Sequence, residues 1–209
     1  MTRTDLTALI HAERAALAAD LADLSAAQWA TPSSCGRWTV EEVVAHLSAG
    51  ASLGRWAWLR SMIAARFDDG VHNDRRLAEH RGTTPAGTLE RFRGVVDGPA
   101  GPTGHTAAWL GEIVVHGDDV RRPLGLAPRP DVEAATAVAE FFAGRDFTVN
   151  SRTAIAGLRL EATDGPFTTG EGALVCGPTL ALVVAMAGRG AACAELTGEG
   201  VEQLRARAA

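Results

Sequence analysis

Residues 106–122 read TAAWLGEIVVHGDDVRR, and this stretch decides the fold of the first half of the chain. Its apolar residues recur at helical spacing and Pro123 follows at once, which predicts a single helix over the stretch. Glu112, His116 and Asp119 stand at positions i, i+4 and i+7 of this helix, so they form one polar stripe along its apolar side. A carboxylate and an imidazole one turn apart can bind a single cation.

A second stretch, residues 37–47, reads RWTVEEVVAHL. Thr39 is a typical N-cap residue, and Glu42 stands at the position of a capping box, so we expect a helix over about 40–66. The apolar stripe of this helix places His46 at its border, where a side chain can face a cleft between helices.

His46, Glu112 and His116 together are the ligand types that catalytic zinc sites take from a protein, with one position left open. Asp119 or Asp118 could accept a hydrogen bond from the outer nitrogen of a ligating histidine. Spacing alone leaves the ordinary alternatives open: a solvated Glu–His pair on a helix surface, and a hydrogen-bonded packing histidine.

The rest of the first half predicts more helices, and the second half changes character. Helical patterns cover residues 4–28, 84–96 and 131–145, with a short polar, Arg-rich segment at 73–81. After about residue 150 we expect short strands at 154–161, 167–169 and 173–176, with helices at about 178–188 and 201–207. We therefore expect an α+β protein with a helical bundle over residues 1–148 and a small α/β domain over 149–209.

Composition excludes several classes of function. The formal net charge of −5 gives no electrostatic reason to expect nucleic acid as a partner, because phosphate binding needs a clustered positive surface. The longest apolar stretch, residues 179–187, is too short to span a membrane, and no signal peptide is visible. Cys35, Cys176 and Cys193 have no CxxC spacing, so we interpret them as packing residues of a reduced, cytoplasmic protein.

Some further side chains have two interpretations. The pairs Arg75–Arg76 and Arg121–Arg122 suit surface charge, or the anchoring of a substrate carboxylate. Arg189, in a Gly-Arg-Gly sequence, could bind an anionic group between the domains. The tryptophans form an expected core cluster, one face of which could line a pocket: Trp38, Trp56, Trp58 and Trp109.

The two motifs resemble a known family when taken together. RWTVEEVVAHL resembles the first metal-binding helix of the DinB-like bundle superfamily. EIVVHGDDVRRPLG, at residues 112–125, resembles the ExxxH helix of the mycothiol-dependent maleylpyruvate isomerase family. The resemblance implies a DinB-like four-helix bundle in which His46, Glu112 and His116 are metal ligands and catalytic residues. Residues 157–164 and 177–182 resemble the family's C-terminal domain, which is similar to sterol-carrier-like folds.

The resemblance also implies an activity. Such enzymes use a divalent metal, zinc by preference with nickel as an alternative, to hold mycothiol as a thiolate that adds to a small electrophile. Isomerases release the thiol again and S-transferases retain it. Arg76, Asp119 and Arg189 are our candidates for binding the cofactor, and a monomer or homodimer is expected. The alternative is a non-catalytic metal- or ligand-binding module that acts as a sensor or binds a partner.

Overall fold

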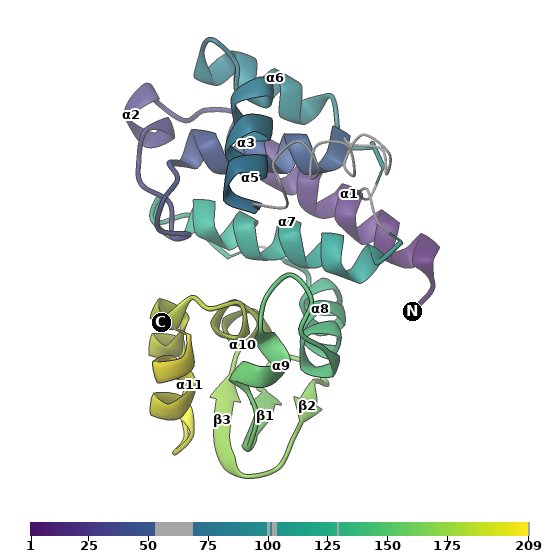
Figure 1. Cartoon of the computed structure of the whole chain (residues 1–209), viewed down its shortest axis with the longest axis vertical. Helices are drawn as coiled ribbons and strands as arrows, with labels where there is room; N and C mark the ends of the chain where they lie inside the picture. Colours follow the sequence, from purple (N-terminus) through teal and green to yellow (C-terminus); the bar gives the residue numbers. More distant parts are fainter. Residues whose placement is uncertain (53–68, 100, 102–103, 129, 209) are drawn as a thin grey trace. The chain divides into compact units, whose positions relative to one another are not determined.

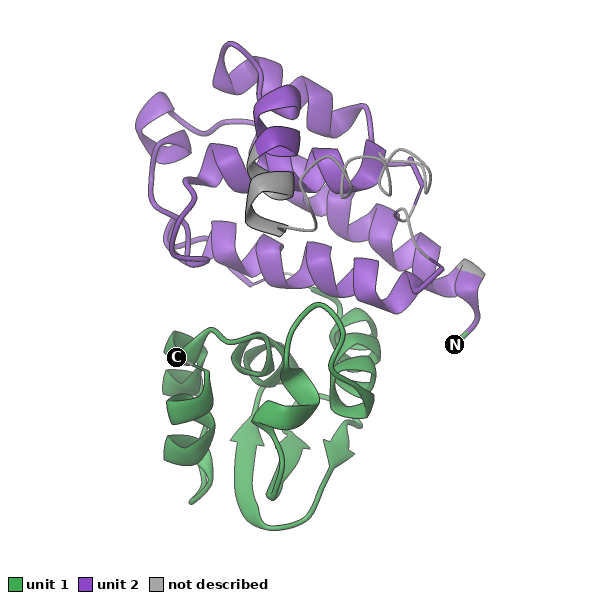
Figure 2. Ribbon diagram, in the orientation of Figure 1, with its two compact units in different colours: residues 1, 130–209 green, residues 2–129 purple. Residues whose placement is uncertain are grey.

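The computed structural model describes residues 1–52, 69–99, 101, 104–128 and 130–208, and it divides the chain into two compact units. One unit comprises residues 2–129, and the other comprises residues 130–209, to which Met1 is also assigned (Figure 2). The sequence suggested a boundary between residues 148 and 149. The division lies earlier because helix α8 (Val132–Gly144) packs on α10 (Thr179–Met186), in the second unit.

The first unit is helical in its described part (Figure 1). Helix α7 packs against both α1 and α3, and α3 also contacts α5 and α6. The helices of this unit are α1 (Arg3–Asp20), α2 (Ala26–Trp29), α3 (Val40–Ser52), α5 (Asp69–His80), α6 (Pro85–Arg93) and α7 (Thr106–Arg121).

Capping residues explain where several of these helices begin. The backbone N–H of Thr39 donates to Glu42 (2.9 Å) and the N–H of Glu42 donates back to Thr39 Oγ1 (3.3 Å), which is the predicted capping box. Thr84 caps α6, whose first residue is Pro85. Ser25 forms another capping box and starts α2, so the single helix expected over 4–28 is two helices.

Two further segments were expected from the sequence at 73–81 and 40–66. The Arg-rich segment expected at 73–81 is helical and forms most of α5. The helix expected over 40–66 is described as far as Ser52, and residues 53–68 lie outside the described part of the chain, as do Trp56 and Trp58.

The core between the helices is apolar along the expected stripes. α3 buries its whole apolar stripe, and α1 and α7 also bury apolar side chains. Burial of apolar surface on this scale is the main force that holds the helices together. The fully buried or nearly fully buried residues include Ile10, Leu17 and Leu21 in α1, Val40, Val43 and Val44 in α3, and Leu110, Ile113 and Val114 in α7.

The second unit combines helices with a small sheet of order β2-β1-β3. Strand β1 (Leu158–Ala162) pairs antiparallel with β2 (Thr168–Thr169) and parallel with β3 (Ala173–Gly177). The strand expected from residue 154 begins later, because a short helix, α9 (Ser151–Ala154), precedes it. α10 follows β3 and contacts α8, and the chain continues through a 3-10 helix (Gly190–Glu195) to α11 (Val201–Arg207).

The structure thus confirms the α+β class. In the part of the chain that is described, no helix is both long and apolar enough to cross a membrane.

Candidate metal centre

Helices α3 and α7 bring His46, Glu112 and His116 together. One donor atom of each side chain lies within 4.8 Å of the others. Both His46 Nε2 and His116 Nε2 lie 3.4 Å from Glu112 Oε2, so the carboxylate is shared between two imidazoles. The three side chains are 13–24% exposed, so the cluster is partly accessible to solvent.

Asp119 fixes the orientation of His116. Its Oδ2 lies 2.9 Å from His116 Nδ1, and its side chain is completely buried. When Nδ1–H donates a hydrogen bond to Asp119, the other ring nitrogen, Nε2, is the one that faces Glu112 and can bind a metal ion. Asp118, the other acceptor considered from the sequence, instead forms an ion pair with Arg122 (2.9 Å).

The electrostatics of the cluster favour a cation. Burial raises the pKa of Glu112, but hydrogen bonds from His116 and His46 outweigh it and hold this pKa well below its usual range. Burial lowers the pKa of His116, but hydrogen bonds to Asp119 and Glu112 raise it to about 9. Burial lowers the pKa of His46, so its imidazole is uncharged at neutral pH and can serve as a metal ligand.

The donor set fits a divalent transition metal. Two imidazoles and one carboxylate, here from two helices, are a common ligand set of catalytic zinc, which takes its fourth ligand from water or substrate. The carboxylate that holds the second nitrogen of His116 completes a carboxylate–histidine–metal arrangement. We therefore regard His46, Glu112 and His116 as the candidate ligands.

Trp38 connects this cluster with a neighbouring pocket. Its ring centroid lies 4.8 Å from that of His46 and 6.3 Å from that of His116. The guanidinium of Arg37 lies over the Trp38 ring, 4.7 Å from its centroid. Trp38 is thus not simply part of a tryptophan core, but one wall of a pocket, as the second interpretation of the sequence allowed.

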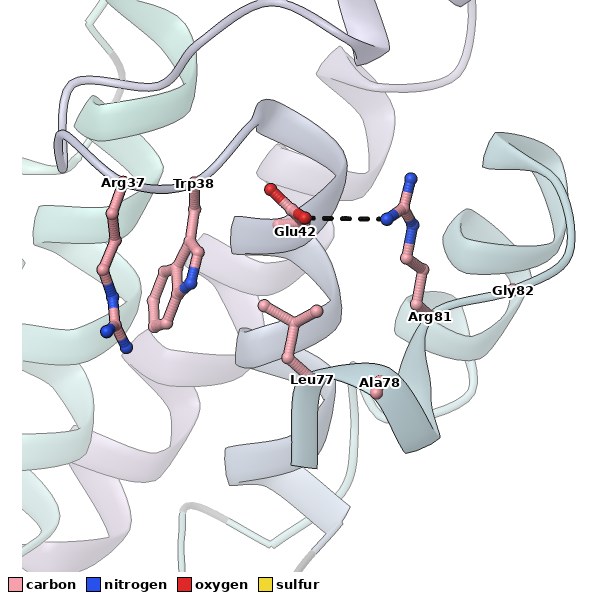
Figure 3. Close-up of a pocket in the computed structure, with 7 residues that line it drawn as sticks. All are labelled: Arg37, Trp38, Glu42, Leu77, Ala78, Arg81 and Gly82. Atoms are coloured by element: carbon pink, nitrogen blue, oxygen red, sulfur yellow. Dashed lines mark ion pairs between the residues drawn. The ribbon is translucent and has the colours of Figure 1, made fainter. Parts of the chain in front are cut away.

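The pocket has a volume of about 590 Å³ and lies between the start of α3 and the end of α5 (Figure 3). Glu42 and Arg81 form an ion pair of 3.6 Å on one side of it (Figure 3). The lining is Arg37, Trp38, Glu42, Leu77, Ala78, Arg81 and Gly82.

Cys35 lies beside the candidate centre, which sequence reasoning did not anticipate. Its Sγ, a ring nitrogen of His116 and a carboxylate oxygen of Asp119 all lie within 4.8 Å of one another. The backbone N–H of Ser34 donates to the carbonyl oxygen of Asp119 (2.9 Å), and this bond holds the loop against α7. No local pattern signals the contact, because it depends on how the turn before α3 folds back.

The arginine candidates have other partners. Arg76 pairs with Glu79 within α5. Arg189 lies in the other unit and donates to the carbonyl oxygen of Ala187 (2.8 Å). Arg121 is a correction, because it is only 2% exposed and pairs with Asp20 (2.7 Å) instead of forming surface charge.

Fold and site together define a protein with a helical unit that carries a candidate metal centre, followed by a small α/β unit. Residues 10–98 match the domain family described as Mycothiol maleylpyruvate isomerase N-terminal domain. Over these residues the chain is therefore similar to this family, the one that its motifs resembled. The match includes His46 and ends before α7, so the assignment of Glu112 and His116 depends on the geometry of the cluster.

Solved structures share the fold. A mutant form of mycothiol-dependent maleylpyruvate isomerase is 14% identical, with a TM-score of 0.62, and the alignment covers 95% of this chain and 93% of that chain. A further crystal structure of mycothiol-dependent maleylpyruvate isomerase has the same identity and coverage, with a TM-score of 0.58. Comparison with curated protein sequences finds no match to the chain.

Proposed function

We propose that this protein is a metal-dependent thiol enzyme, a mycothiol-dependent isomerase or S-transferase, with its reactive centre at His46, Glu112 and His116. The observation that carries the proposal is the convergence of these three donors within 4.8 Å, with Asp119 holding the outer nitrogen of His116. The thiol, mycothiol, and the reaction class are taken from the domain family that residues 10–98 match and from the similar structures of mycothiol-dependent maleylpyruvate isomerase.

A divalent ion at this centre, zinc by preference with nickel as an alternative, would lower the pKa of a small thiol enough to keep it as a thiolate at neutral pH. The protein's own groups prepare that chemistry. Asp119 keeps His116 in one tautomer and one orientation, and Glu112 contributes the negative charge that favours a cation. His46 offers a neutral nitrogen, because burial disfavours its protonated form.

The neighbouring pocket suits a small, anionic electrophile. Trp38 provides an apolar wall, and the guanidinium group of Arg37 can attract negative charge. Arg81 lines the pocket as well, but its guanidinium is already paired with Glu41 (2.8 Å) and Glu42 (3.6 Å). A thiolate that adds to a conjugated double bond turns it into a single bond, which can rotate. Loss of the same thiolate then gives the isomer, whereas protonation of the adduct gives a transferase product.

Two arginines remain proposals for binding the thiol cofactor or the substrate carboxylate: Arg76 on α5 and Arg189 after α10. Asp119 would act on the cofactor only through His116. We expect the enzyme to work in the cytoplasm, where small thiols stay reduced.

The test is to mix purified, zinc-loaded protein with mycothiol and a panel of electrophiles that includes maleyl compounds. Loss of free thiol reports transferase activity, and conversion of a maleyl to a fumaryl compound without loss of thiol reports isomerase activity. We expect one of the two, and we expect His46→Ala, Glu112→Ala and His116→Ala each to abolish it and to lose bound zinc.

The matched control is His11→Ala, because His11 lies on α1 and bonds to the carbonyl oxygen of Gly98 (2.9 Å). This variant should retain zinc and activity. Zinc retained at full stoichiometry by all three ligand variants would place the metal elsewhere. Bound zinc with neither reaction across the panel would favour the non-catalytic binding module.

A further inference from the structure

We infer that the protein has a second metal position, formed by Cys35, His116 and Asp119, which binds a thiophilic divalent cation such as Zn²⁺ or Co²⁺. This position goes beyond the proposed function, because it uses the second ring nitrogen of His116. His116 Nε2 faces Glu112 and the first position, whereas Nδ1 faces Asp119.

The geometry of the loop before α3 holds Cys35 in place. Ser33 Oγ donates to the carbonyl oxygen of Trp38 (2.6 Å) and lies 3.0 Å from Cys35 Sγ. The N–H of Ser34 donates to the carbonyl oxygen of Asp119. Bonds on both sides of the turn therefore fix the thiol against α7, and the donor atoms of the cluster lie within 4.8 Å of one another.

The three donors have the right chemistry for such an ion. Thiolate sulfur, imidazole nitrogen and carboxylate oxygen are the three ligand types that zinc takes in proteins. A sulfur ligand selects thiophilic metals over magnesium or calcium. Cys35 is partly exposed whereas Asp119 is completely buried, so an ion reaches the position from the side of the thiol.

The charges of the donors are also suitable for a cation. Asp119 contributes a completely buried carboxylate, and a thiol such as that of Cys35 loses its proton when it binds a metal ion.

The test is a titration of the metal-free, full-length protein with Co²⁺, followed by absorption spectroscopy. A thiolate ligand gives a sulfur-to-cobalt charge-transfer band in the near ultraviolet, which nitrogen and oxygen ligands do not give. We expect the band to grow with the second equivalent of Co²⁺. It should be absent in Cys35→Ser and unchanged in the matched control Cys176→Ser, which also removes a partly exposed thiol.

The outcomes separate this inference from the proposed function. Binding of one equivalent without the band leaves the His46 centre intact and overturns the second position. A band that persists in Cys35→Ser also overturns it. A band in His46→Ala that disappears in the double variant with Cys35→Ser supports the second position even if the thiol enzyme proposal fails.

Alkylation gives a second measurement that does not depend on a variant. Co²⁺ beyond the first equivalent should slow the reaction of Cys35 with iodoacetamide at least tenfold, as followed by peptide mass spectrometry. The rate at Cys176 should not change. Equal rates at Cys35 with one and with two equivalents would contradict the inference.

Discussion

His116 Nδ1 and Asp119 Oδ2 lie 2.9 Å apart on one face of α7, and the Asp119 side chain is completely buried. A buried carboxylate that accepts a hydrogen bond from a histidine N–H favours one tautomer of the ring and restricts its rotation. The buried Asp119 therefore holds the His116 ring in place from inside the helical unit. Ligands from solvent can reach the partly exposed cluster.

The first prediction concerns this bond. Asp119→Asn should weaken zinc binding at the His46 centre about 10- to 100-fold, because the loss of such a partner leaves the ligating ring less basic and less fixed. The affinity is measured by competition with a chelator in a Cys35→Ser background, so that only one position is titrated.

The matched control for Asp119→Asn is Asp118→Asn. Asp118 is the neighbouring buried carboxylate, but its partner is Arg122 and not a histidine. Its substitution should leave the zinc affinity within about twofold of the parent. Equal losses in the two variants would mean that α7 is perturbed in general, and the specific role of Asp119 would be wrong.

Trp38 yields the second prediction. Trp38→Ala removes one wall of the pocket of about 590 Å³, so the KM for the electrophile should rise about tenfold, equivalent to about 1.4 kcal/mol. The zinc content should stay near that of the parent, because Trp38 supplies no ligand. Steady-state kinetics and elemental analysis measure the two effects.

Phe147→Ala is the control for Trp38, because Phe147 is an aromatic side chain with 47% exposure in the other unit. It should leave KM unchanged. Loss of zinc from Trp38→Ala at unchanged KM would instead show that Trp38 supports the ring of His46.

The sequence predicted those features that depend on local periodicity. The spacing of Glu112, His116 and Asp119 on one helix followed from 3.6 residues per turn, and so did the border position of His46. The capping residue Thr39 likewise predicted the start of α3, because an N-cap acts within one turn. These interactions involve residues that are close in the chain.

Other features depend on contacts between distant segments, and the sequence did not predict them. Cys35 reaches His116 only because the turn at residues 33–38 folds back onto α7. Arg121 looked like surface charge, since nothing near it in sequence indicates that Asp20 lies beside it. The placement of α8 in the second unit likewise depends on packing against α10.

The third prediction concerns the pair of Asp20 and Arg121, which joins α1 to the end of α7. Arg121 Nε donates to Asp20 Oδ2 at 2.7 Å, and the side chains are 2% and 10% exposed. Asp20→Ala leaves a buried guanidinium without this carboxylate, so the free energy of unfolding should fall by about 3 kcal/mol.

The control is Asp23→Ala, which removes an exposed carboxylate just after α1 and should change the free energy of unfolding by less than about 0.5 kcal/mol. Urea unfolding measures both, and equal small changes would mean that Arg121 finds another partner.

The last prediction is a pH dependence in the second unit. Asp164 Oδ1 accepts hydrogen bonds from the N–H (2.8 Å) and the hydroxyl (2.6 Å) of Thr179, the first residue of α10. Burial raises the pKa of Asp164, but these bonds outweigh it and hold the pKa below the ordinary value of 3.8. The carboxylate thus stabilises the start of α10 fully above about pH 4, and the effect is lost as the pH falls through the lower pKa of the folded state.

Asp164→Ala should therefore lower the hydrogen-exchange protection of the first turn of α10 at neutral pH by about 1 kcal/mol, the usual contribution of a helix cap. The difference between variant and parent, compared at equal pH, should shrink as the pH falls below 4. Glu171→Gln, which changes an exposed carboxylate of the same unit, should show no difference at either pH. A loss of protection in Asp164→Ala that stayed constant down to acidic pH would mean that the contribution of Asp164 comes from packing and not from its charge.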